Sequence, residues 1–227
     1  PYTALARRSL MLLPRETMMP RLCDSRIGTV PVPFVKFSDR EQEAKAVYYA
    51  CRWNLRPSDP AAFAAGKLTA PERPIVFYVD DTFPAGWYDA IRRGVLSWNA
   101  AFEKIGYRDA VQVRPYPRDD ASFDPNDIKF SCVKYANTMG ENLSSSARID
   151  PRSGEILGAT ICIPHNVTSR IRTDLFVQLG AADPDARRVK MSPELFGKAL
   201  AADVARHTGA VSYTHLRAHE TRSNLVC

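Results

Sequence analysis

The sequence lacks several features that would place a chain at once in a protein class. No apolar run approaches the roughly 18 residues of a membrane-spanning helix, and no internal repeat or low-complexity tract is present. The most signal-like stretch, Ser9–Leu13, is short and runs directly into Pro14. The chain also begins with Pro1 rather than Met, so we expect an internal piece of a longer polypeptide with further domains on both sides.

Charge is not concentrated either. The formal net charge of +6 is compatible with a nucleic-acid or anionic partner, yet the 31 Lys and Arg residues are scattered and form no block. A solvated surface explains such a distribution, and we expect no nucleic-acid partner. A basic nucleic-acid-binding module stays as an alternative, and it would bind duplexes with a steep salt dependence.

Cysteine is sparse, and its spacing excludes two kinds of site. The five cysteines are Cys23, Cys51, Cys132, Cys162 and Cys227, and none of them forms a C-x-x-C pair. A cysteine zinc site and a dithiol redox motif are therefore not expected. Sparse cysteines are more typical of buried thiols, and their redox state stays open.

The first part of the chain has the pattern of a short β-rich segment. Residues 27–37 and 44–55 favour two strands, separated by the polar turn 38–43. Residues 57–74 contain four prolines around an alanine-rich patch. We interpret residues 1–56 as the end of an upstream domain and residues 57–73 as a linker.

From Pro74 onward the pattern predicts a mixed domain of strands and helices. A buried strand is expected at 75–79, followed by an amphipathic helix from Trp87 to Gly106. Further strands are expected at 111–114, 128–135 and 155–163, with helices beginning at Asn166 and at Ser192. The order by itself indicates an α/β or α+β globular domain.

Short motifs in order along the chain resemble one protein family. They are Leu12–Pro14, Arg52–Leu55, Pro74–Asp80, Gly94–Phe102, Asp150–Leu157, His165–Val167, Phe176–Gln178 and Asp183–Arg187. Together they are similar to the large, secreted, zinc-dependent metalloproteases of bacteria. The resemblance implies an α+β fold in which residues 74–211 are the N-terminal part of a zincin-like (metzincin-type) catalytic domain, with a mixed twisted sheet and long helices. It also implies a secreted or periplasmic parent protein that acts on peptides or proteins.

The zinc-binding motif of that family is not preserved here. The resemblance implies a helix with the pattern H-E-x-x-H-x-x-G-x-x-H, in which two His bind zinc and the Glu acts as general base on metal-bound water. Arg206, His207 and Ala210 occupy the H-E-x-x-H positions. Arginine stays protonated and cannot bind zinc. We therefore expect no catalytic residue, no metal ligand and no zinc in this chain, although the parent family hydrolyses peptide bonds with zinc.

The last residues have no counterpart in the family. Residues 212–227 resemble translated adapter sequence, and we interpret them as a non-native tail without a place in the fold. The alternative is that His215 and His219, one helical turn apart with Glu220 adjacent, form a zinc pair.

One segment has a predicted binding role. In metzincin-like proteases a strand of similar pattern lies at the sheet edge above the cleft and pairs with extended substrate. The resemblance assigns substrate binding to Leu157, Gly158, Ala159, Thr160 and Ile161, and an ordinary interior strand is the alternative. The helix at 193–209 should then pack beneath this strand. A pseudoprotease that binds peptides without cutting them is the alternative to a plain inactive fragment.

Overall fold

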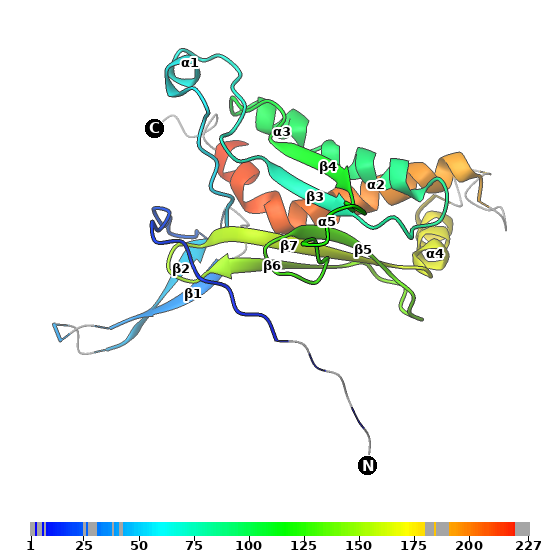
Figure 1. Cartoon of the computed structure of the whole chain (residues 1–227), viewed down its shortest axis with the longest axis horizontal. Helices are drawn as coiled ribbons and strands as arrows, with labels where there is room; N and C mark the ends of the chain where they lie inside the picture. Colours follow the sequence, from blue (N-terminus) through cyan, green and yellow to red (C-terminus); the bar gives the residue numbers. More distant parts are fainter. Residues whose placement is uncertain are drawn as a thin grey trace.

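The structure is a computed structural model with side chains. It describes residues 3, 6, 8–24, 26, 31–37, 39–40, 43–179, 184 and 191–220, with side chains at 178–179 and 209–220 left out. Within these ranges a five-stranded sheet, a two-stranded hairpin and several helices make an α+β molecule (Figure 1).

The five-stranded sheet is the central element of the fold. Its strands are β3 (Ile75–Val79), β4 (Val111–Pro115), β5 (Ser131–Ala136), β6 (Ser144–Asp150) and β7 (Glu155–Pro164), in the spatial order β4-β3-β5-β7-β6. All neighbours are parallel except β6, which runs antiparallel to β7. The apolar runs predicted at 75–79, 111–114, 128–135 and 155–163 are thus confirmed as strands, because strands covered by other structure read as nearly continuous hydrophobic segments.

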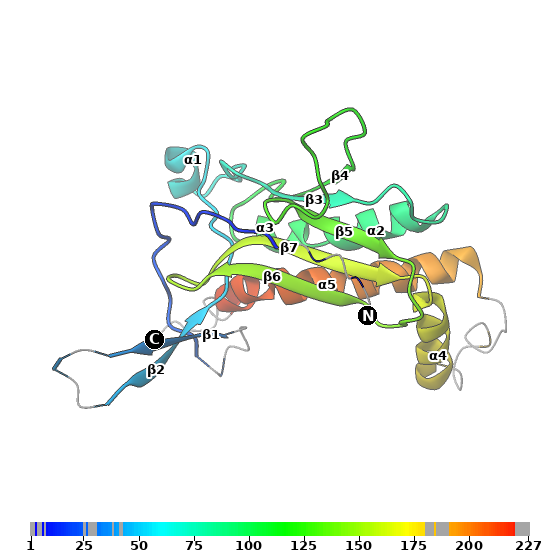
Figure 2. The ribbon, with the colours of Figure 1, turned by 60° about the horizontal axis from the view of Figure 1, so that its bottom comes forward.

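Helices cover one face of this sheet. Figure 2 shows α2 (Trp87–Leu96) and α5 (Pro193–Glu220) behind the strands, while α4 (Val167–Leu179) lies at one end. Helix α5 contacts α2, β6 and β7, and its side chains Leu200 and Val204 are buried in the core together with Ile161 of β7. The prediction that the helix from residue 193 packs beneath strand 155–163 is confirmed.

The single helix predicted from Trp87 to Gly106 is two helices. Helix α2 ends at Leu96, and α3 occupies Asn99–Glu103. At the break, the Ser97 hydroxyl donates to the Gly94 carbonyl at 2.7 Å, and the Trp98 indole N–H donates to the Ala205 carbonyl of α5 at 2.7 Å. The tertiary bond to α5 fixes Trp98 at the break, a constraint that helical periodicity does not reveal.

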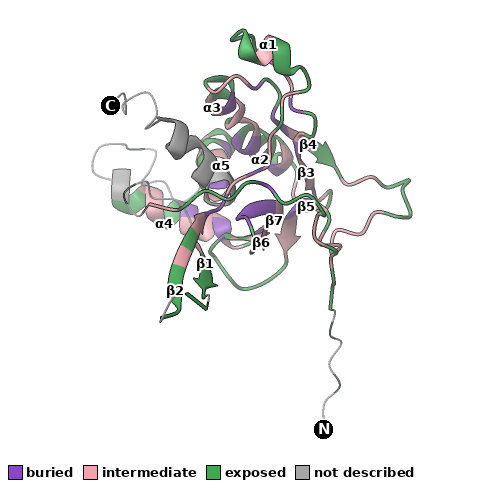
Figure 3. Ribbon diagram, turned by 90° about the vertical axis from the view of Figure 1, so that its left-hand side faces the viewer, coloured by how far each residue is buried: buried purple, intermediate pink, exposed green. Residues whose placement is uncertain are grey.

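The hairpin of β1 (Pro31–Lys36) and β2 (Lys45–Ala50) projects away from this body (Figures 1 and 2). The two predicted strands are shorter than expected, and residues 27–30 lie outside the described residues. Figure 3 shows the hairpin mostly exposed, whereas buried residues gather where the five-stranded sheet faces α2 and α5.

The residues just before the predicted domain boundary at residue 56 pack into the main core. Cys51 and Trp53 are 2% and 8% exposed and belong to the same core as the five-stranded sheet. Arg52 pairs with the start of β7, because its N–H donates to the Gly154 carbonyl and its carbonyl accepts from the Ile156 N–H. Residues 51–55 are thus part of the main core rather than of a separate upstream domain.

The predicted linker at 57–73 also contains structure. A short helix, α1, spans Pro60–Ala64 and is capped by the Asp59 carboxylate. The ring of Phe63 packs against Tyr107 with centroids 4.9 Å apart, and the Tyr107 hydroxyl donates to the Leu55 carbonyl at 3.1 Å. This segment is therefore packed against the main domain.

The interpretation of residues 212–227 as a non-native tail stays a prediction. Helix α5 continues through residue 220, so residues 212–220 are helical in backbone. The predicted alternative pair of His215 and His219 falls on side chains outside the described set, and residues 221–227 also lie outside it. No described helix combines the length and apolar character that crossing a membrane requires, as the sequence predicted.

Candidate functional site

The five residues predicted to bind substrate lie in an interior strand. β7 pairs with β6 on one side and with β5 on the other, and the two registers overlap at Thr160 and Ile161. On the β5 side, the Ala159 N–H donates to the Ser131 hydroxyl at 3.0 Å. A peptide could not add beside Thr160 and Ile161, whose strand has neighbours on both sides, and the assignment of substrate binding to Leu157, Gly158, Ala159, Thr160 and Ile161 stays a prediction.

A glycine is required at position 158 because of a neighbouring side chain, not because a peptide must approach it. The guanidinium of Arg148, on β6, lies over it, and a Cβ added at Gly158 would come within 2.4 Å of Arg148 Nη2. Arg148 donates to the Phe130 carbonyl at 2.8 Å and to the Thr160 hydroxyl at 2.9 Å. The missing side chain of Gly158 therefore lets Arg148 tie β6 to the loop before β5.

β4 and β6 are the two edge strands of the sheet, and the edge considered for binding is β6. It is the outermost strand after β7, and no other strand among the described residues pairs with its far side. Its sequence, Ser144–Asp150, contains no proline, so every residue carries an amide donor. An unblocked edge strand offers a row of N–H and C=O groups to an extended peptide. Local sequence pattern does not predict this strand, because its first half is a polar serine run.

Helix α5 forms the floor beneath this edge. It contacts β6 from below, and its turn from Asp203 to His207 corresponds to the expected zinc-motif region. The side chain of Arg206 is mostly exposed and lies 3.2 Å from an Asp203 carboxylate oxygen. His207 Nδ1 lies 2.9 Å from the Asp203 carbonyl oxygen, a bond within its own helix.

These residues do not form a donor set for zinc. Arg206 carries a permanent positive charge, Ala210 has no ligand atom, and one nitrogen of His207 already faces the Asp203 carbonyl. Within the part of the chain that the structure describes, no three His, Cys, Asp or Glu side chains are grouped so that they could hold a metal ion. The expectation that this chain binds no zinc stays a prediction.

A buried ion pair links α4 and α5 under β6. The Arg170 guanidinium donates to Asp203, and these side chains are 18% and 3% exposed. Arg170 also donates to Asp174 at 3.0 Å and to the Glu141 carbonyl, just before β6, at 3.3 Å. Local periodicity does not predict this contact, because the partners come from three separate segments.

The turn between β6 and β7 holds the N-terminal segment. Asp150 is fully buried and accepts hydrogen bonds from the Arg152 side chain and N–H, which lower the pKa of its carboxyl group. The same Arg152 donates to the Pro14 carbonyl at 2.8 Å. Residues near Pro14 are therefore anchored at one end of β6.

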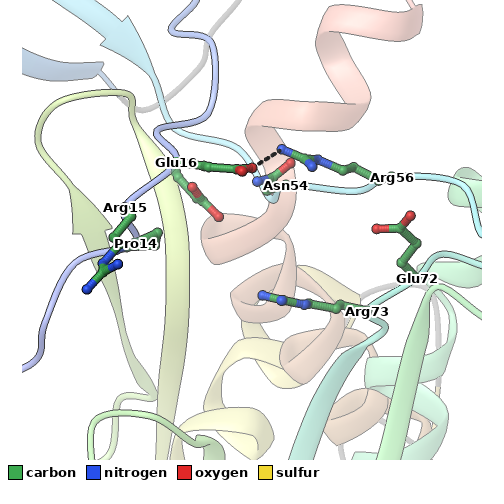
Figure 4. A pocket seen from close by; sticks show the side chains of 8 residues that line it. Pro14, Arg15, Glu16, Asn54, Arg56, Glu72 and Arg73 are labelled. Atoms are coloured by element: carbon green, nitrogen blue, oxygen red, sulfur yellow. Dashed lines mark ion pairs between the residues drawn. The ribbon is translucent and has the colours of Figure 1, made fainter.

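A charged cavity of about 440 Å³ adjoins this turn. Figure 4 shows Pro14, Arg15 and Glu16 on one side and Arg56, Glu72 and Arg73 on the other, with Asn54 and the buried Glu155 completing the lining. The dashed line marks the ion pair of Arg56 with Glu16, whose atoms are 3.9 Å apart. Three arginines face three glutamates, so the cavity favours neither an anion nor a cation.

The cysteines behave largely as buried thiols. Cys51 and Cys132 are buried, and burial raises the pKa of each thiol to about 11. Cys23 and Cys162 are partly exposed, and Cys227 lies outside the described residues. None of the four described cysteines forms a disulfide. Their high pKa values disfavour the thiolate form, so Cys51 and Cys132 are not suited to nucleophilic chemistry.

Comparison with known proteins adds one finding. A family model described as a domain of unknown function (DUF5117) matches residues 1–58. This part comprises the N-terminal segment, the hairpin and the residues around Trp53 that enter the main core. No curated protein and no solved structure matches the chain.

Proposed function

We propose that this chain is part of a zinc-dependent metallopeptidase and that it retains the groove for an extended peptide without the zinc-binding motif. The observation that carries the proposal is the free edge of β6 directly above α5. A second support is the ordered set of motifs that resemble the metalloprotease family, from Leu12–Pro14 to Asp183–Arg187.

The groove suits a peptide in extended conformation. A bound peptide would add to β6 as a further strand, and its main chain would pair with the outward N–H and C=O groups of Ser144–Arg148. Main-chain pairing supplies affinity with little dependence on sequence, while alternate side chains point down toward α5. This arrangement fits a protein that binds many different peptides.

Catalysis belongs to the parent family rather than to this chain. When zinc is bound in such enzymes, it activates a water molecule for attack on the peptide carbonyl. Arg206, His207 and Ala210 supply neither the two ligands nor the base at those positions. A natural pseudoprotease and a damaged copy of an active enzyme both predict peptide binding without cleavage.

The test is a set of proline substitutions in two exposed edge strands, β6 and, as the control, β1. Neighbouring residues of a strand point their N–H groups in opposite directions, so one of Ser145→Pro and Ser146→Pro removes an outward donor and the other breaks pairing with β7. We expect the variant that keeps its urea midpoint to lose binding of a short, capped, fluorescein-labelled peptide rich in valine and threonine. Fluorescence anisotropy measures the affinity.

The matched control is Val35→Pro in β1, which alters the other exposed edge and should leave peptide binding unchanged. If the wild-type protein does not bind the peptide, the proposed function is wrong. Equal affinity in the folded β6 variant and the wild type would place the peptide elsewhere.

A further inference from the structure

One side chain joins the three elements that surround the groove. Arg170, on α4, reaches the loop that enters β6 through the Glu141 carbonyl and reaches α5 through Asp203. It remains bonded to its own helix through Asp174. A second tie runs between the same segments, since the Asn166 amide donates to the Met139 carbonyl at 3.3 Å. The β6 edge and the floor beneath it are therefore connected through α4.

The Arg170–Asp203 ion pair contributes more to the relative positions of the segments that it joins than to the stability of the fold. A buried ion pair gives little net stabilisation, because desolvation offsets most of the attraction between the charges. A guanidinium, however, holds its donors in a rigid planar fork, so its three acceptors must keep fixed relative positions. Asp203 lies one helical turn before His207, and its second oxygen forms an ion pair with Arg206 at 3.2 Å. The pair thus fixes the Asp203–His207 turn of α5.

We infer that Arg170 is a positioning residue of the peptide groove, which sets the spacing between the β6 edge and the Asp203–His207 turn of α5. The inference rests on the proposed function for what the groove holds. Arg170 does not contact the peptide. It acts through β6 and α5, whose positions it fixes. Its removal should change the width of the groove more than the stability of the fold.

The decisive variant replaces the ion pair by apolar side chains of similar size, Arg170→Met with Asp203→Leu. Such replacements of buried pairs are commonly neutral or stabilising, so the urea midpoint should stay or rise. The affinity for the labelled valine- and threonine-rich peptide should nevertheless fall by about fivefold or more, the usual scale of coupling between sites. An unchanged affinity with an unchanged midpoint would overturn the inference.

Two further variants complete the test. Arg170→Lys keeps the charge next to Asp203 but cannot reach three acceptors at once, so it should weaken binding and leave the midpoint nearly unchanged. It decides the matter if the double variant does not fold, and wild-type affinity in Arg170→Lys would then reject the positioning role. The control pair Glu194→Gln with Lys198→Met lies exposed on the same helix and should change neither measurement.

A measurement without peptide separates this inference from the proposed function. Amide hydrogen exchange at Ser144–Ser146 should be faster in the double variant, while amides of β3 (Ile75–Val79) keep their wild-type rates. If the wild type binds no peptide but this local change appears, the proposed function fails and the link through Arg170 stands. Identical exchange at Ser144–Ser146 in both proteins contradicts that link.

Discussion

Two edge strands of the molecule, β1 of the hairpin and β6 of the five-stranded sheet, differ in the amide donors that they can offer to another chain. In β1, Pro31 and Pro33 lack amide protons, so the strand cannot offer a regular row of donors. In β6, all residues of Ser144–Asp150 have amide protons, and α5 supports the strand from one face.

The two edge strands, β1 and β6, also differ in the structure that supports them. Hairpin β1–β2 projects from the body with Phe34, Val35 and Tyr48 exposed, and a two-stranded hairpin is marginally stable by itself. β6 belongs to a five-stranded sheet with a large core beneath it. An edge strand that binds a peptide needs both free donors and a rigid base, and the comparison shows that β6 has both.

The largest expected effect tests where the hairpin region stops and the main core begins. Trp53→Ala should reduce the free energy of unfolding by about 3–5 kcal/mol, because it leaves a cavity among the buried side chains of the five-stranded sheet. Phe34→Ala, in the exposed hairpin, should cost less than about 1 kcal/mol. Urea denaturation measures both. Similar costs for the two variants would contradict the placement of residues 51–55 in the main core.

A smaller effect is expected where Arg148 of β6 packs over Gly158 of β7. Gly158→Ala should displace the Arg148 guanidinium and break its bonds to the Phe130 carbonyl and Thr160, at a cost of about 1–2 kcal/mol in unfolding free energy. Gly140→Ala is the matched control, since the nearest atom to its added Cβ is 3.5 Å away.

Thermal and urea unfolding give the values for this pair of variants. In a protein that already carries Arg148→Ala, Gly158→Ala should lower the unfolding free energy by less, because the guanidinium that the added methyl group would contact is absent. An equal cost in both backgrounds would mean that Arg148 is not what requires the glycine.

The smallest expected effect concerns pH at the end of β6. The pKa of Asp150 is lowered by hydrogen bonds from Arg152, so its folded-state pKa lies below the unfolded value of about 3.9. The carboxylate therefore stabilises the fold above that value, and this contribution is lost as the pH falls through the folded pKa. Wild type should exceed Asp150→Asn in stability at pH 7, and the difference should shrink below about pH 4.

Urea midpoints of both proteins across this pH range give the measurement. Asp174→Asn is a useful control, because Asp174 is half exposed and pairs with Arg170 on the same helix. A stability difference for Asp150→Asn that persists at the acid end would show that the lost charge is not its cause.

Much of the fold could be predicted from local pattern, because the central strands and the helix faces have strong hydrophobic signals. Ile75–Val79 and Glu155–Pro164 contain no exposed residue, and such strands are recognisable as apolar runs. Strand β6 could not be predicted in the same way, since Ser144, Ser145 and Ser146 are polar.

The candidate site was missed for a related reason. Whether a strand is interior or at an edge depends on the spatial order of the strands, which local periodicity does not contain. The segment Leu157–Ile161 has a suitable composition, but β6 pairs with the side that a substrate would need. Likewise, Arg170 and Asp203 are 33 residues apart, and only the packing of α4 against α5 brings them together.

The turn Asp150–Gly154 has a consequence for how the chain can vary in length. Tips of β-hairpins usually accept inserted residues without damage to the domain. Here Gly154 has a φ of +76°, and a Cβ at that position would meet the Ala50 carbonyl oxygen at 2.5 Å. The same turn holds Pro14 through Arg152 and pairs with Arg52. The turn therefore anchors the N-terminal region, and inserted residues such as tags or grafted loops should destabilise the domain at this position.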